Sequence, residues 1–123
     1  MIVPEYLSAE WFDAANEAIA ELSTPEQVTI RFEVADTCTY DLTVGPNSSF
    51  EADASGTADV VLSLDYATAA AISQGIESAQ AAFMSGRMRL GGDAMALVTA
   101  NAELETATDR LLALRDATTY RDA

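Results

Sequence analysis

Alternating hydrophobic and polar positions predict β-strands in the first half of the chain. Hydrophobic side chains occupy every second position in residues 28–35 and 38–44, and the same alternation recurs in 49–54 and 58–64. A period of two is typical of strands with one buried face. The short link between the first two segments predicts a hairpin, and four strands in series predict an antiparallel meander.

Hydrophobic residues with helical spacing flank this strand-rich region. Residues 8–22 form one apolar stripe, and Ser8 is placed to cap its start. The composition changes at Asp65, after which an alanine-rich segment runs to Gly75, a residue typical of helix C-termini. We therefore expect a helix on each side of the strands.

A helix, a strand and further helices are predicted in the last third of the chain. Residues 77–85 predict a short helix ending at Gly86, and residues 87–90 predict a fifth strand. Asp93 can cap a helical region that extends from Ala94 to about Ala117. Residues 1–123 therefore predict one α+β domain, with helices gathered on one side of a sheet.

Composition narrows the chemistry that the chain can perform. Half of the 123 residues are hydrophobic, there is no histidine, and Cys38 is the single cysteine. A histidine-based triad or zinc site is thereby excluded, and Cys38 in a strand pattern is expected to pack in the core. The N-terminus shows no secretory pattern, and no stretch is apolar enough to span a bilayer. These features predict a cytoplasmic protein without a metal or other cofactor.

The charge is strongly negative. Twenty acidic residues face six basic ones, all arginines, which gives a net charge of −14. Such a surface repels nucleic acid and disfavours stable docking on anionic membranes. The acid excess has an alternative explanation, in which it only keeps the protein soluble or adapts it to a salty cytoplasm.

Residues 80–93, QAAFMSGRMRLGGD, carry a resemblance to a known family. A glutamine, a small residue and an aromatic residue precede Gly86, after which a strand of alternating basic and apolar residues leads to Gly92 and Asp93. This pattern is similar to the signature of the sterol carrier protein type-two family. The wider order of elements over roughly residues 10–115 resembles that family too.

The resemblance implies a five-stranded, mostly antiparallel sheet with helices over one face. It also implies a hydrophobic tunnel between sheet and helices that accepts sterols, fatty acyl chains and similar molecules. Apolar and aromatic side chains would line such a site. The candidates are Trp11, Phe12, Ile72, Ile76, Phe83, Met84, Met88, Leu90, Leu97, Leu111 and Leu114. We expect a neutral hydrophobic ligand, because relatives that handle acyl-coenzyme A tend to be basic and this chain has no lysine.

Two other interpretations stay open at this stage. The cavity could serve a small enzyme, such as an isomerase or cyclase, with Tyr40, Asp41, Asp59 or Asp65 as the acid or base. The chain could instead be an accessory subunit whose apolar helix faces bind another protein or a second copy of itself. Non-catalytic carriage of a ligand is the interpretation that the resemblance favours.

Overall fold

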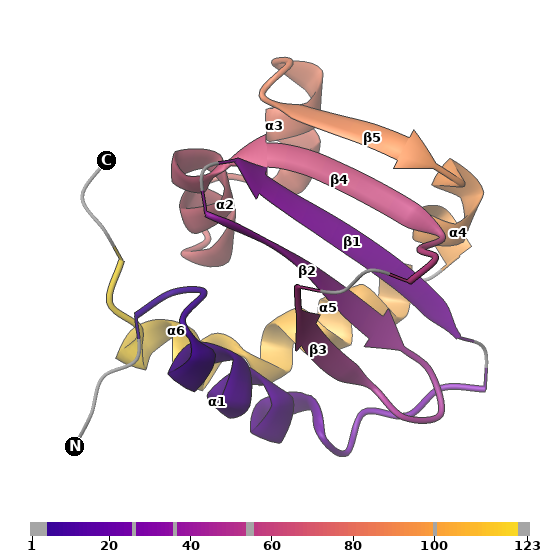
Figure 1. The fold of residues 1–123 in the computed structure, drawn as a ribbon, viewed down its shortest axis with the longest axis vertical. Coiled ribbons are helices and arrows are strands. Elements are labelled where there is room, and N and C mark those ends of the chain that lie inside the picture. The colour runs from indigo at the N-terminus through magenta and orange to yellow at the C-terminus, as the bar shows by residue number, and fades with distance from the viewer. Residues whose placement is uncertain (1–4, 26, 36, 54–55, 100, 121–123) are drawn as a thin grey trace.

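The computed structural model of the protein describes residues 5–25, 27–35, 37–53, 56–99 and 101–120. Within these ranges a sheet packs against helices, as Figure 1 shows. The strands are β1 (Val28–Ala35), β2 (Cys38–Val44), β3 (Ser49–Ala52), β4 (Val60–Asp65) and β5 (Met88–Gly92). The helices are α1 (Ala9–Ile19), α2 (Tyr66–Ser73), α3 (Ala79–Met84), α4 (Ala94–Thr99), α5 (Asn101–Arg110) and α6 (Leu112–Ala117).

The strand order is β3-β2-β1-β4-β5. Every neighbouring pair is antiparallel except β1 and β4, which are parallel, with Ile30 opposite Val60. The predicted α+β class and mostly antiparallel sheet are confirmed, and so is the hairpin of β1 and β2. The predicted meander is wrong at β4, because β4 pairs with β1 instead of with β3.

Gly56, which follows β3 and precedes β4, lies over the outer face of the sheet, and β3 and β4 are on opposite sides of β2 and β1. Arg31 and Asp41 are opposite each other on that face and form two hydrogen bonds of 2.9 and 3.1 Å. Arg31 also donates to the Gly56 carbonyl at 2.6 Å. Asp41, which is only 5% exposed, therefore helps to hold Gly56 over this face by positioning Arg31.

The inner face of the sheet carries the core. Alternating residues such as Ile30, Val44 and Val60 are almost completely buried there, because helices cover this face, with α3, α4 and α5 behind the sheet as drawn in Figure 1. Helix α1 packs beside β3, the edge strand. The Asn16 side chain bonds both the N–H and the carbonyl of Phe50, at 2.6 and 3.1 Å, and so satisfies backbone groups at this edge.

The predicted helix ends agree with the hydrogen bonds. Ser8 accepts from the Trp11 N–H, and Asp65 accepts from the Thr68 N–H at 2.7 Å. Hydrogen bonding by the Thr68 side chain, and then by its N–H, lowers the pKa of the Asp65 carboxyl below its ordinary value. Gly86 follows α3 with φ +79°, in the left-handed region. The C-terminal helical region is divided, because α5 ends at Arg110 and α6 begins at Leu112.

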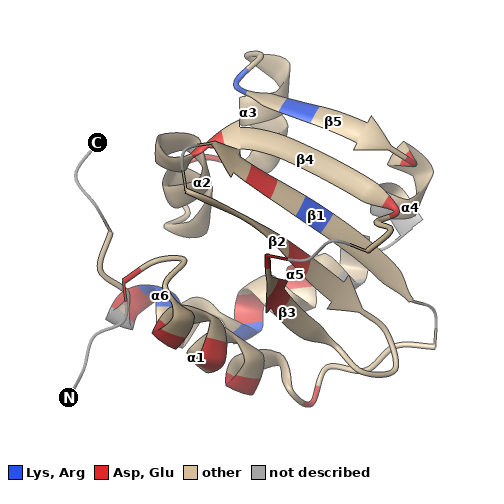
Figure 2. Ribbon diagram, in the orientation of Figure 1, with Lys and Arg blue, Asp and Glu red and all other residues tan. Residues whose placement is uncertain are grey.

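Acidic side chains dominate the helical surface, with red bands along α1 and on α5 in Figure 2. Three ion pairs join described residues, namely Arg31 with Asp41, Arg87 with Glu77, and Arg115 with Asp116. Six arginines cannot neutralise 20 carboxylates, so repulsion between acidic side chains opposes the folded state.

Added salt is therefore expected to stabilise the protein. Raising the ionic strength from about 0.01 M to about 0.15 M shortens the screening length from about 30 Å to about 8 Å, which weakens this repulsion. The melting midpoint, followed by circular dichroism, should rise by several degrees. In the double variant Asp13→Asn, Glu17→Gln, which removes two exposed charges from α1, the rise should be smaller. A midpoint that does not change with salt would contradict the expected repulsion.

Candidate functional site

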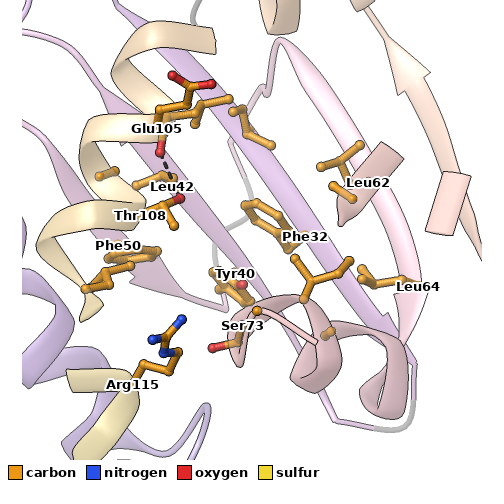
Figure 3. A pocket seen from close by; sticks show the side chains of 18 of the residues that line it. Phe32, Tyr40, Leu42, Phe50, Leu62, Leu64, Ser73, Glu105, Thr108 and Arg115 are labelled. Carbon is orange, nitrogen blue, oxygen red and sulfur yellow. Dashed lines mark hydrogen bonds between the residues drawn. The ribbon is translucent and has the colours of Figure 1, made fainter. Parts of the chain in front are cut away.

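A cavity of about 670 Å³ lies between the sheet and the helices. Its volume falls within the range of about 300 to 1,000 Å³ that is usual for small-molecule sites. Large apolar and aromatic side chains from the inner face of the sheet form its floor (Figure 3). They are Ile30, Phe32, Tyr40, Leu42, Phe50, Leu62, Leu64, Met88 and Leu90. The same alternation that buries one face of each strand thus supplies an apolar floor.

Helices supply the walls of the cavity. On one side stand α2 and α3, including Ala69, Ile72 and Phe83, and on the other stand α5 and α6. The residues from α5 and α6 include the apolar stripe of Leu104, Ala107, Leu111 and Leu114, with the Leu111 position between the two helices. Two aromatic residues from the N-terminal part of the chain, Tyr6 and Trp11, also line the cavity.

The exposed members of the lining mark where the cavity meets solvent. On one side the exposed residues are Gly75, Ala79, Gln80 and Phe83, and on the other they are Glu105, Thr108, Asp109 and Leu112. The mouth therefore lies between α3 and the α5–α6 segment. Two carboxylates stand on its α5 side, so the electrostatic environment of the mouth disfavours highly anionic molecules.

Most of the residues singled out in the sequence lie around this cavity. Seven line it, namely Trp11, Ile72, Phe83, Met88, Leu90, Leu111 and Leu114. Phe12 instead packs in the adjoining core, with its ring 5.2 Å from that of Tyr40. Ile76, in the link between α2 and α3, and Met84, the last residue of α3, are 74% and 77% exposed and lie outside the cavity. The side chain of Leu97 lies outside the described part of the structure.

Sequence reasoning missed most of the floor. Phe32, Tyr40, Leu42, Leu62 and Leu64 belong to the predicted inward faces of their strands, and all five line the cavity. Alternation identifies an inward side chain, but it does not distinguish a position beneath a helix from a position beneath an empty space. The apolar positions of the first four predicted strands were therefore the available signal, whereas the candidates came from the predicted helices and the fifth strand.

Two tyrosines place hydroxyl groups in the lining. Burial raises the pKa of Tyr6 well above its ordinary value, and burial likewise raises that of Tyr40. The Tyr6 hydroxyl donates to the Ala69 carbonyl at 3.4 Å. Both phenols stay protonated near neutral pH, so they act as neutral hydrogen-bonding groups and not as bases.

The carboxylates considered as acids or bases have other partners. Asp41 binds Arg31 on the outer face of the sheet, Asp59 accepts from the Thr29 N–H at 2.8 Å, and Asp65 caps α2. None of these three lines the cavity, and of the four residues considered only Tyr40 does. The carboxylates of the lining, Glu105 and Asp109, are exposed at the mouth.

The described ranges contain no cluster of three or more histidine, cysteine or acidic side chains arranged to hold a metal ion. In the same part of the chain, no helix has the length and hydrophobicity that crossing a bilayer requires.

Comparison with solved structures identifies similar folds at low sequence identity. A crystal structure of sterol carrier protein 2 shares 15% identity, with a TM-score of 0.63, and the match covers 91% of this chain and 98% of that one. Sterol carrier protein domain 2 of Helicoverpa armigera shares 12%, with a TM-score of 0.59 and coverages of 81% and 87%.

The fold also occurs inside a larger chain. A double mutant of the sec-alkyl sulfatase PisA1 shares 18% identity with a TM-score of 0.56, and the match covers 78% of this chain but 16% of that one. At these identities the likeness establishes the fold alone. A search of curated proteins gives no significant match.

Comparison with protein families gives the assignment. Residues 9–105 match the SCP-2 sterol transfer family, which is most of the chain and includes the QAAFMSGRMRLGGD segment. The resemblance seen in the sequence is confirmed by this match and by the shared fold. This chain belongs to the SCP-2 sterol transfer family.

Proposed function

We propose that the protein binds a hydrophobic small molecule in its cavity and carries it without changing it chemically. The observation that supports this function most is the apolar floor and walls of a cavity of about 670 Å³. A sterol-like, fatty acyl or polyketide-like body fits such a lining. Absence of a carboxylate from the interior part of the described lining favours carriage over acid–base catalysis.

Burial of the ligand's apolar surface supplies the binding free energy. Each buried methylene group contributes about 0.8 kcal/mol, before the cost of ordering the ligand is deducted. Aromatic side chains such as Phe32, Tyr40 and Phe50 add rigid contact area without losing much conformational entropy. A ligand with a long or polycyclic hydrocarbon part would gain most from this site.

The charge distribution limits what can approach the mouth. Glu105 and Asp109 border it, and the whole chain carries a net charge of −14. Acyl-coenzyme A would place several negative charges beside these carboxylates, so we propose that it is excluded. Exchange of ligand with neutral vesicles should for the same reason be at least as fast as with anionic ones.

A direct binding measurement tests the carrier function. A fluorescent sterol or fatty acid analogue should bind near one-to-one and be displaced by unlabelled lipids that lack a coenzyme A group. Native mass spectrometry of freshly purified protein should show a co-purified ligand of low mass.

The same experiments can contradict the proposal. If no analogue binds while the protein is folded, the carrier function fails. Chemical turnover of the bound molecule would support an enzyme instead. A stable complex with another protein, formed without any bound lipid, would support an accessory subunit.

A further inference from the structure

One end of the cavity carries a positive charge. Arg115 of α6 is the only basic residue in the described lining. Figure 3 shows it at the same end as Ser73 and Tyr40, while Glu105 lies at the other end. Glu105 belongs to α5 and Arg115 to α6, ten residues further along the chain. The cavity is therefore electrically asymmetric along its length.

The surroundings of Arg115 hold its guanidinium close to the cavity wall. A Cβ atom added to Gly75, after α2, would lie 3.0 Å from Nη1, so the arginine packs directly against this glycine. Nearby, the hydroxyls of Ser73 and Tyr120 are joined by a hydrogen bond of 2.9 Å. Burial raises the pKa of Tyr120, and the Ser73 hydrogen bond and the Arg115 charge offset part of this rise.

Among the residues that the structure describes, none accepts a hydrogen bond from the Arg115 guanidinium. Its ion pair with Asp116 spans 3.7 Å between Nε and Oδ1, which is longer than a hydrogen bond, and Asp116 is exposed. Arg31, by contrast, bonds Asp41 through two nitrogens, and Arg87 bonds Glu77 and Ser85. Among the arginines for which the structure gives ion pairs, Arg115 is thus the one whose guanidinium N–H groups make no hydrogen bond to a described residue. It also borders an apolar cavity.

We propose that Arg115, with the Ser73–Tyr120 hydroxyl pair, is a headgroup subsite for a single carboxylate on an otherwise apolar ligand. The planar guanidinium matches a carboxylate in two parallel hydrogen bonds. The hydrocarbon part then lies along the floor, toward Leu62 and Leu90. Glu105 and Asp109 disfavour the reverse orientation, because they would face the ligand's negative charge.

This subsite rests on the proposed carrier function and narrows its ligand class. The net charge of the chain predicts a neutral ligand, but that charge acts through water and is screened beyond about 10 Å at ordinary ionic strength. Arg115 acts at contact distance and beside an apolar wall, where an ion pair is less screened. A single charge at this position is compatible with the exclusion of coenzyme A at the mouth.

Paired ligands and paired variants test the subsite. The probes are a long-chain fatty acid and its methyl ester, whose hydrocarbon chains are the same and whose heads differ in charge. Arg115→Gln is expected to weaken binding of the acid at least tenfold and to change binding of the ester less than twofold. Arg115→Lys keeps the positive charge but lacks the planar guanidinium, so it should recover part of the lost affinity for the acid. Arg110→Gln, on an exposed arginine of α5 outside the lining, should change neither affinity.

The outcomes separate the subsite from the carrier function. If Arg115→Gln weakens acid and ester equally, or affects neither, the subsite is refuted while the carrier function stands. If the wild-type protein binds neither probe, both proposals fail. Measurement of the melting midpoint of each variant shows whether a loss of affinity reflects unfolding.

Discussion

Ala69→Phe is expected to weaken binding of a fluorescent lipid analogue more than tenfold while the protein stays folded. Ala69 lines the cavity from α2 and is almost completely buried, so a phenyl ring at this position would occupy space that the ligand needs. A ring that fills an existing cavity loses little by overpacking, unlike one placed in a filled core. Titration of the analogue, with a parallel melting curve, measures both effects.

A second variant tests the same volume from the opposite wall. Ala107 of α5 also lines the cavity and is 2% exposed, and Ala107→Phe should reduce affinity to a similar extent. Ala67→Phe is the matched control, because Ala67 is exposed on α2 and lies outside the lining. Wild-type affinity in folded Ala69→Phe and Ala107→Phe proteins would show that ligands do not occupy this cavity.

Gly92→Ala is expected to lower the free energy of unfolding by about 3 kcal/mol, as the sum of two costs. Gly92 has φ +83°, and a side chain in the left-handed region costs about 1 to 2 kcal/mol. Its added Cβ would also lie 2.6 Å from the Asp59 carbonyl oxygen, which accepts from the Asp93 N–H. The atoms nearest to this Cβ are all backbone atoms of Asp59 and Val60. Relief of the contact therefore requires a shift of β5 against β4.

Two other glycines separate these costs. Gly86 has φ +79°, but no heavy atom lies within 4 Å of an added Cβ, so Gly86→Ala should cost only about 1 to 2 kcal/mol. At Gly91 the nearest contacts would be ordinary ones of 3.9 Å, and Gly91→Ala should change stability least. Chemical denaturation of the three variants gives the order. Equal losses at Gly86 and Gly92 would contradict the backbone contact with Asp59.

Local sequence was sufficient for the strands and for the helix ends that have a capping residue. The strand alternation, the caps at Ser8, Asp65 and Asp93, and the helix end at Gly86 depend on residues within a few positions of one another. Periodicity and capping chemistry report such short-range interactions directly. The family resemblance adds the sheet and helix arrangement, because a motif can identify a fold whose long-range contacts it does not encode.

The position of β4 in the sheet could not be predicted from local sequence. Its alternation is compatible with pairing to either β3 or β1, and the parallel pairing with β1 is decided by contacts about 30 residues apart. The Arg31–Asp41 pair and the Gly56 carbonyl meet only once the chain crosses the sheet. Such pairing depends on the packing of the whole molecule, which no window of residues contains.

The cavity was predicted only in part, for a related reason. Sequence pattern alone determines which side chains face inward, and it placed Ile72, Phe83 and Met88 on that side. Tertiary structure decides where inward side chains meet and where they leave a space, and it brings Arg115 of α6 beside Gly75 and into the lining. Periodicity indicates which single residues are buried, whereas the size of a cavity depends on the distance between secondary-structure elements. That distance is set by how the helices rest on the sheet.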